Sequence, residues 1–503
     1  MLGHKERQFK EHTLHLEQCV PRTNFYRQVE AKLDLSFVTE LVKDCYSPSL
    51  GRPSIDPIVF FKLQLIMFFE GIRSERQLMD IVSLNLAHRW YTGYDLDEAL
   101  PDHSSLSKIR TRYGLHVFEQ FFEHIVEQCI EAGLVWGKEL YFDGTKVRAN
   151  AAVDKMVSRW YWEAKQHVTT LFASQLSSPE PPAAPLVQGQ DTPSATADLS
   201  IPEPSSPGLA ALVEKYDGTR LNDKRTVSYE RVTDRKVSLT DPDATPMSRF
   251  TGDRAKLGYH TQYVVDGGKR RIILAALVTP ASVMDNTPML DLERWVRFRW
   301  RLKPKIAVGD TKFGTVENIV GLAEDGIMAY LPTADFSQRN EFYALERFTY
   351  DAERDLYTCP NGKELRLHSR RQREEVFVYR ALAKTCNVCP LKAKCTDSQS
   401  GRHIFRSFYQ ADVDRARGYR ETEAYEKAMR KRQVWVEPLF GEGKQWHEMG
   451  RFRLRGLAKV NIEGVMRAAG QNIKRLLTRH QWDKPRLPAA PAALPVSFPC
   501  FLW

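Results

Sequence analysis

The stretch "GKELYFDGTKVRANA", residues 137–151, decides how this chain is interpreted. Its apolar run 140–142 leads into Asp143, and Gly144, Thr145 and Lys146 follow at once. The pattern predicts a buried strand that ends in a carboxylate. Open α/β sheets keep their functional groups at the ends of strands, so we expect Asp143 to have partners from elsewhere in the chain.

A second stretch repeats this pattern. In "KPKIAVGDTKFG", residues 303–314, an apolar run leads into Asp310. A single aspartate in such a place more often serves a turn than a ligand. Two carboxylates at one sheet edge suit a divalent metal ion, because Mg²⁺ prefers hard oxygen ligands.

A third carboxylate is expected from the segment "VEPLFGEGKQWHEMGRFRLRGLAKV", residues 436–460. Glu437 and Glu442 both compete for this role. Proline fits only the first turn of a helix, so Pro438 predicts that Glu437 lies at a helix end or at a kink. Glu437 and Lys444 are seven positions apart and would share one face of a helix.

Composition describes a globular chain of several domains. With 503 residues, 42% hydrophobic and 27% charged, roughly two to four domains are expected. No apolar run reaches the roughly 20 residues of a membrane helix. The start "MLGHKERQFKEH" lacks the apolar core of a signal peptide, so we expect a cytoplasmic protein without a membrane partner.

The positive charge is concentrated near the C-terminus. The net charge is +10, and thirteen Lys or Arg against four Glu between residues 427 and 480 give 13 − 4 = +9 for that segment. This asymmetry indicates a polyanion partner such as nucleic acid. A basic face that is merely solvated is the alternative.

The organisation changes along the chain. Helix signals fill the first part, including Asp56 before Pro57 and a Ser74–Gln77 capping box. This bundle, with a basic edge at Lys108, Arg110 and Arg112, fits either DNA binding or a scaffold. Alternating strands and helices then predict a layered α/β domain. The expected divisions are 1–135, helical; 136–332, α/β, with a disordered Pro/Ser/Ala insertion near 177–208; 333–410, a strand-rich insertion; 411–480, the Glu and basic helices; and 481–503, a Pro/Ala-rich tail.

Four of the eight cysteines are grouped in the 333–410 segment. The stretches "YTCPNGKEL" and "CNVCPLKAKC" contain Cys359, Cys386, Cys389 and Cys395. A Cys-x-x-Cys pair with two further cysteines can close a tetrahedral zinc site. Reduced, buried thiols are the alternative, since a cytoplasmic protein keeps its cysteines out of disulfides.

The order "YFDGTKVRANA", "AVGDTKFG" and "VEPLFGEGKQWHEMGRFRLRGLAKV" resembles the DDE transposases of bacterial insertion sequences, in the IS4/IS5-like superfamily and the IS1182 group. "GRPSIDPIVFFKLQLIMFFEGIRSERQLM" and "LPDHSSLSKIRTR" resemble the helical N-terminal domain of that family. By this resemblance the catalytic triad falls on Asp143, Asp310 and Glu437, with Lys444 as the lysine of the tail motif. Arg432 stands near the place of the family's arginine, with four residues instead of three before the Glu.

The resemblance implies an α/β, RNase H-like (retroviral integrase superfamily) catalytic domain, a helical N-terminal DNA-binding domain and a strand-rich, Cys-containing insertion. It implies Mg²⁺ or Mn²⁺ as cofactor and double-stranded DNA as partner, both terminal inverted repeats and target. A homodimer on DNA, associated with the nucleoid, is also implied. Arg432, Arg451, Arg453 and Arg455 are the expected phosphate contacts. A nuclease that does not join strands and a catalytically idle DNA-binding regulator remain as alternatives.

Overall fold

The computed structural model describes residues 13–47, 54–176, 208–216, 235–248, 254–333 and 341–482. The chain forms two compact units, a helical unit from residues 1–134 and 466–503 and an α/β unit from residues 135–465. The expected disordered insertion, up to residue 207, and the tail from residue 483 lie outside the described residues. Among the helices that are described, none is both long enough and apolar enough to span a membrane.

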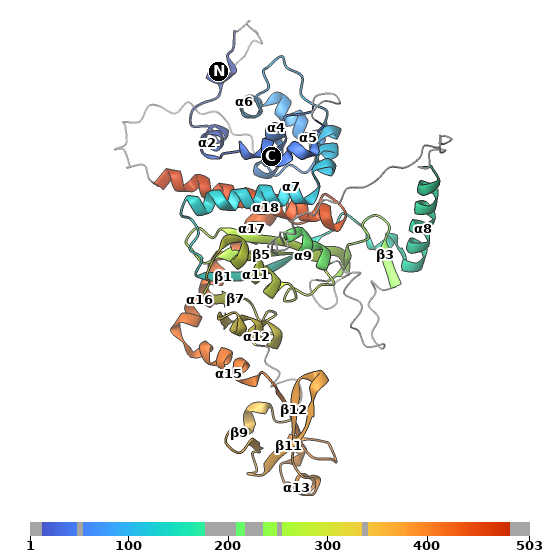
Figure 1. Ribbon diagram of the computed structural model, residues 1–503, viewed down its shortest axis with the longest axis vertical. Coiled ribbons are helices and arrows are strands. Elements are labelled where there is room, and N and C mark those ends of the chain that lie inside the picture. Colours follow the sequence, from blue (N-terminus) through green and yellow to red (C-terminus); the bar gives the residue numbers. More distant parts are fainter. Residues whose placement is uncertain are drawn as a thin grey trace, which may run out of the picture. The chain divides into compact units, whose positions relative to one another are not determined.

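The helical unit starts its helices where the sequence predicts (Figure 1). The Asp56 carboxylate accepts from the N–H of Ile58 at 2.7 Å and caps α4, with Pro57 in the first turn. The Ser74 hydroxyl accepts from the N–H of Gln77 at 3.4 Å and caps α5. The helices of this unit are α1 Leu16–Cys19, α2 Phe25–Lys32, α3 Phe37–Val42, α4 Pro57–Phe69, α5 Glu75–Leu84, α6 Leu86–Thr92, α7 His103–Glu131 and the C-terminal part of α18 Leu457–Trp482.

Aromatic packing holds this unit together. The rings of Phe61 on α4 and Phe121 on α7 stack with their centroids 4.3 Å apart. Helix α7 breaks at Gly114, whose φ of 63° is open to glycine at little cost. Gly470 of α18 lets Phe68 approach, because a Cβ there would lie 2.4 Å from the Phe68 ring.

The α/β unit is built on a six-stranded mixed sheet, as the resemblance implied for an RNase H-like domain. The strand order is β4–β5–β1–β7–β8, with β6 also paired to β5. Strands β5 and β6 form an antiparallel hairpin, and β7 and β8 run parallel to β1. The strands are β1 Glu139–Arg148, β4 Thr245–Met247, β5 Lys256–Asp266, β6 Ile273–Pro280, β7 Ile306–Val308 and β8 Met328–Tyr330. Its helices are α9 Leu209–Lys215, α11 Met289–Trp300, α12 Val316–Glu324, α15 Gln410–Gly418, α16 Glu423–Trp435 and α17 Glu437–Trp446; α8 Arg159–Leu176 adjoins the pair β2 Met156–Ser158 and β3 Lys236–Ser238.

The prediction that Asp143 ends its strand is wrong. Strand β1 continues to Arg148, because its antiparallel pairing with β5 runs on to Arg148 opposite Gly258. The parallel pairing of β1 with β7 stops earlier, at Tyr141 opposite Val308. Asp143 therefore lies where β7 has ended and the flank of β1 is open. Asp143 thus lies level with the carboxyl end of the parallel strand β7, although β1 itself continues to Arg148.

A second sheet lies in residues 349–407, drawn in orange in Figure 1. Its five antiparallel strands are ordered β13–β12–β11–β10–β9. We call residues 341–409 the cysteine lobe, since α13 Ala383–Asn387 and α14 Lys392–Cys395 within it carry cysteines. The strands are β9 Thr349–Asp351, β10 Leu356–Thr358, β11 Glu364–Arg371, β12 Val376–Arg380 and β13 His403–Ser407.

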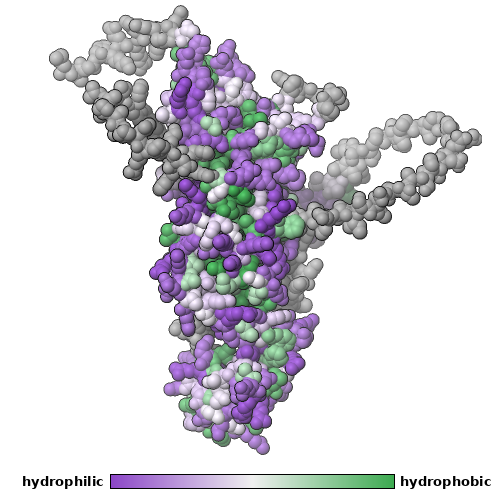
Figure 2. Space-filling model, turned by 60° about the vertical axis from the view of Figure 1, so that its left-hand side comes forward, coloured by the Kyte–Doolittle hydropathy of each residue, from purple (hydrophilic) through white to green (hydrophobic). Residues whose placement is uncertain are grey.

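The face of the molecule in Figure 2 is mainly hydrophilic, with smaller apolar areas between the polar ones. This distribution fits a chain with 27% charged residues.

Candidate active site

Asp143 and Asp310 lie at matching positions of two neighbouring parallel strands. Each is two residues beyond the last registered pair, Tyr141 opposite Val308. Asp143 is buried, with 9% of its surface exposed, and Asp310 is half-buried. The Asp310 carboxylate accepts from the N–H of Lys312 at 2.8 Å, which fixes the turn after β7. The structure thus brings together the two aspartates that the sequence singled out.

Helix α17 brings Glu437 to the same face of the sheet. Glu437 is its first residue and Pro438 lies in its first turn, as the sequence predicted. The ring of Phe440 on α17 stacks on Tyr263 of β5, with 4.7 Å between centroids. Tyr263 is the cross-strand neighbour of Asp143, and such neighbours project from one face of a sheet. This packing sets the beginning of α17 beside Asp143.

Arg432 of α16 lies between two of the acids. Its Nη1 is 3.6 Å from Oδ2 of Asp143, and its Nη2 donates to Oε1 of Glu437 at 3.1 Å. Only 11% of the Arg432 side chain is exposed. The sequence suggested a DNA contact for this residue; the structure places it as the counter-ion of the acids.

The electrostatics of Asp143 are those of a carboxylate that needs a cation. Burial raises its pKa from 3.8 to about 6; Arg432 and the N–H of Gly144 act in the opposite direction, and the charges of Asp310 and Glu437 raise it further. Asp143 therefore lies within electrostatic range of both other acids. A bound divalent ion would offset the cost of burying the Asp143 charge and would reduce the repulsion between the acids. The donor set therefore fits Mg²⁺ or Mn²⁺.

The acids converge without yet forming a coordination sphere. Across the described ranges, no group of three or more His, Cys, Asp or Glu side chains is in place to bind a metal ion. The Arg432 guanidinium holds Asp143 and Glu437 instead. Arg432 thus balances the charge of these two acids.

Glu442, the competing third acid, has a different neighbour. Its Oε1 lies 3.5 Å from Nε2 of His447. Glu437, in contrast, contributes to the raised pKa of Asp143 and shares Arg432 with it. The geometry therefore favours Glu437.

Three further residues near the aspartates were missed in the sequence. Nζ of Lys312 and Nδ1 of His260 each lie 2.8 Å from the buried Asp285 carboxylate. Burial by itself would raise the pKa of Asp285, but His260 and Lys312 hold it below its usual range. The charges of Asp285, Asp310 and Asp143 together raise the pKa of Lys312 against the effect of its own partial burial. A weak signal existed, since Asp285 comes five residues after the apolar strand β6 ends at Pro280, whereas Asp310 comes two residues after β7 ends.

The predicted basic contacts of the α/β unit differ in exposure. Lys444 is exposed, and its Nζ donates to Oγ1 of Thr145 at 2.5 Å. Arg451 and Arg455 are exposed and bind the loop after β1 through Asn150, at 2.9 and 3.0 Å. Arg453 is half-buried; burial lowers the pKa of its guanidinium, and the Glu463 carboxylate acts in the opposite direction.

One predicted contact of the helical unit is corrected. Lys108 and Arg112 are exposed on α7. The side chain of Arg110 is only 6% exposed and forms an ion pair with Glu75 of α5. Alternate positions of a helix point to different sides, so Arg110 faces inward where its neighbours in the pattern face water. Arg110 holds two helices together and is not placed to contact DNA.

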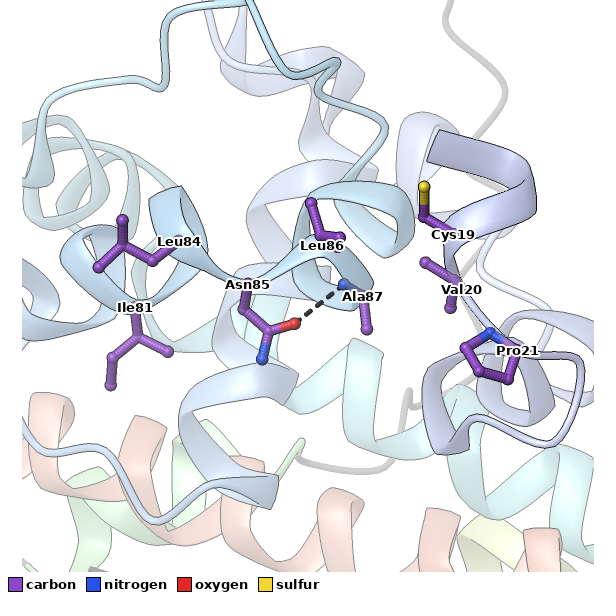
Figure 3. A pocket seen from close by; sticks show the side chains of 8 residues that line it. All are labelled: Cys19, Val20, Pro21, Ile81, Leu84, Asn85, Leu86 and Ala87. Atoms are coloured by element: carbon purple, nitrogen blue, oxygen red, sulfur yellow. Dashed lines mark hydrogen bonds between the residues drawn. The ribbon is translucent and has the colours of Figure 1, made fainter. Parts of the chain in front are cut away.

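A cavity of about 530 Å³ in the helical unit lies between residues 19–21 and the junction of α5 and α6 (Figure 3). Its only amide side chain, Asn85, accepts from the N–H of Ala87 at 2.9 Å and thereby caps α6. No acid or base lines it, and we assign no chemistry to it. The lining residues are Cys19, Val20, Pro21, Ile81, Leu84, Asn85, Leu86 and Ala87.

Two family models match the chain. Residues 14–112 match the family described as "Transposase domain (DUF772)", and residues 358–477 match the "Transposase DDE domain". The second match includes Glu437 and Lys444, while Asp143 and Asp310 lie between the two matched ranges. Comparison with curated proteins and with solved structures gives no match. The two matched parts are each similar to transposase domains, and together they indicate an insertion-sequence transposase of the IS1182-like kind.

Proposed function

We propose that this transposase cuts DNA at the terminal inverted repeats of its element and joins the 3′-OH ends to target DNA. Asp143, Asp310 and Glu437 would hold two Mg²⁺ or Mn²⁺ ions for this reaction. The observation that carries the proposal is the convergence of three acids, from β1, the turn after β7 and the start of α17, around one buried carboxylate. Three carboxylates so close together repel one another when ionised, which is unfavourable. A catalytically idle regulator would gain nothing from such an arrangement.

When bound, the two ions would activate the attacking oxygen and stabilise the leaving oxygen of an in-line displacement. The attacking oxygen is that of water in the cutting step and of the 3′-hydroxyl in the joining step. Asp143 interacts electrostatically with both other acids and would hold the ions together with them. The pair of Lys312 and Asp285 would keep the turn that carries Asp310 in position.

Cations around the acids would stabilise the charge that grows on the phosphoryl oxygens. Lys444, anchored beside the site through Thr145, is the best-placed residue for this role. Arg432, which contacts Asp143 and Glu437, would contribute as well. Exposed Arg451 and Arg455 would follow the phosphate backbone, which gives affinity but little sequence information.

Recognition of the inverted repeats would fall to the helical unit, with Lys108 and Arg112 as phosphate contacts. Two transposon ends must be joined together, so a homodimer assembled on the DNA is part of the proposal. The reaction would take place in the cytoplasm, at the nucleoid.

The test is Mg²⁺-dependent cleavage and joining of a duplex that carries the element's own terminal repeats. Asp143→Asn, Asp310→Asn and Glu437→Gln should each reduce cleavage by at least about 10²-fold while DNA binding persists. Glu442→Gln is the matched control on α17 and should cut normally. Cleavage without joined product would favour the nuclease. Cleavage that survives loss of any one acid would refute the assignment of the triad, and cleavage that is absent from the intact protein would favour the regulator.

A further inference from the structure

The four cysteines of the cysteine lobe come together at one end of its sheet. Cys359 follows β10, Cys386 lies on α13, Cys389 in the next turn, and Cys395 ends α14. Cys359, Cys386 and Cys395 all pack against the same small core. Segments that are more than twenty residues apart in sequence therefore deliver thiols to one place.

Three of the four sulfur atoms each accept a hydrogen bond. The N–H of Lys363 donates to Sγ of Cys359 at 3.3 Å, within a turn closed at Gly362, whose φ is 67°. The N–H of Arg402 donates to Sγ of Cys386 at 3.5 Å. The side-chain amide of Asn361 donates to Sγ of Cys389 at 3.4 Å and so ties the Cys359 turn to the Cys-x-x-Cys segment. Hydrogen bonds of this kind hold a side chain in one orientation, as the partners of metal ligands commonly do.

The thiols also interact electrostatically. Burial raises the pKa of Cys395, Arg402 opposes this, and Cys386, Cys359 and Cys389 each raise it further. In the described part of the chain, no group of three or more such side chains is already in place to bind a metal ion. The same thiols are free of disulfides.

The hydrophobic core of the cysteine lobe is small for a fold of its size. Its core consists of six buried residues, Phe348, Tyr357, Leu365, Tyr379, Ala381 and Ile404. Most of β11 is exposed. Below roughly 70–80 residues a hydrophobic core seldom suffices, and small folds add disulfides or a structural metal.

We propose that Cys359, Cys386, Cys389 and Cys395 bind one structural Zn²⁺ ion. This ion would link the β10–β11 turn to α13 and α14 and so stabilise the lobe. Four thiolates give a closed tetrahedral site with no open position, so the ion has no part in the DNA chemistry. This goes beyond the proposed function and does not depend on it.

The test is the zinc content of the full-length protein, purified under reducing conditions without chelator from zinc-supplemented cells. One zinc per chain is expected, and Co²⁺ should replace it with the visible absorption of a tetrahedral thiolate complex. Four of the eight cysteines should resist alkylation until a chelator is added. Cys359→Ser and Cys389→Ser should lose the metal, whereas the control Cys45→Ser should retain it.

Two results would overturn the proposal. The first is wild-type protein that contains no zinc and gives no cobalt spectrum. The second is zinc that persists in both serine variants. The first result is obtained with wild-type protein alone, so the proposal can be refuted even if the serine variants do not fold.

Discussion

Arg432 and Asp143 form an ion pair across the candidate site, with 3.6 Å between Nη1 and Oδ2. The same guanidinium reaches Glu437, so one cation balances two acids that would otherwise repel each other. A bound divalent ion would take over this balance. The charge of Arg432 is therefore needed most when metal is absent.

Replacing Arg432 by Gln should destabilise the metal-free protein most. Loss of the buried cation leaves Asp143 and Glu437 uncompensated, at roughly 1–3 kcal/mol in the free energy of unfolding. Mg²⁺ should restore a large part of this loss. The measurement is denaturant unfolding in EDTA and in Mg²⁺, with the exposed Arg430→Gln, whose partner Glu426 is 4.0 Å away, as control. An equal loss in both conditions would show that Arg432 does not substitute for the ion.

The raised pKa of Asp143 predicts a specific pH dependence. The folded state binds this proton more tightly than the unfolded chain does, since the pKa rises from 3.8 to about 6. The stabilisation is therefore complete below about pH 4 and is lost as pH rises through about 6. The shift corresponds to up to roughly 3 kcal/mol.

This effect is measured as a difference. In EDTA, wild-type protein should lose up to roughly 3 kcal/mol more unfolding free energy between pH 4 and pH 7 than Asp143→Asn does. Mg²⁺ affinity should rise over the same interval, because the ion competes with the proton. Parallel pH profiles for the two proteins would contradict the assignment.

The Lys312 and Asp285 pair should act on the metal site through the turn that carries Asp310. Lys312→Ala or Asp285→Asn should weaken Mg²⁺ binding and cleavage by about 10–100-fold, as loss of a residue that orients a ligand commonly does. A matched change is Lys305→Ala, an exposed lysine at the start of the same strand region. Titration of Mg²⁺ in the cleavage assay measures the effect. A reduced rate at unchanged Mg²⁺ dependence would argue for a direct role on DNA instead.

The helical unit offers a test with opposite outcomes at neighbouring positions. Lys108→Ala and Arg112→Ala should leave stability unchanged and each lower the salt dependence of DNA binding by about one ion. Arg110→Ala should instead cost about 3–5 kcal/mol of stability, because it removes the cation that balances the mostly buried Glu75 carboxylate. Salt-dependent binding and thermal unfolding of the three variants separate these roles. If the Arg110→Ala variant keeps its stability but binds DNA more weakly, Arg110 is a DNA contact after all.

The local features of the fold were predictable from short stretches of sequence. Asp56 with Pro57, and Ser74 with Gln77, begin helices because a cap and its helix are neighbours in the chain. The position of Glu437 at a helix start followed from Pro438 for the same reason. Two of the aspartates could be singled out because an apolar run that leads into a carboxylate is also a local pattern.

Tertiary structure decided everything that depends on residues distant in the chain. The extension of β1 past Asp143 depends on pairing with β5, and the inward turn of Arg110 depends on Glu75. The contacts of Asp285 with His260 and Lys312, and of Arg432 with Asp143, join segments that no local pattern relates. The sequence by itself determined which acids and thiols this protein has and which helices and strands carry them. Only folding decided which cation each acid meets, because charge pairing depends on distance in space.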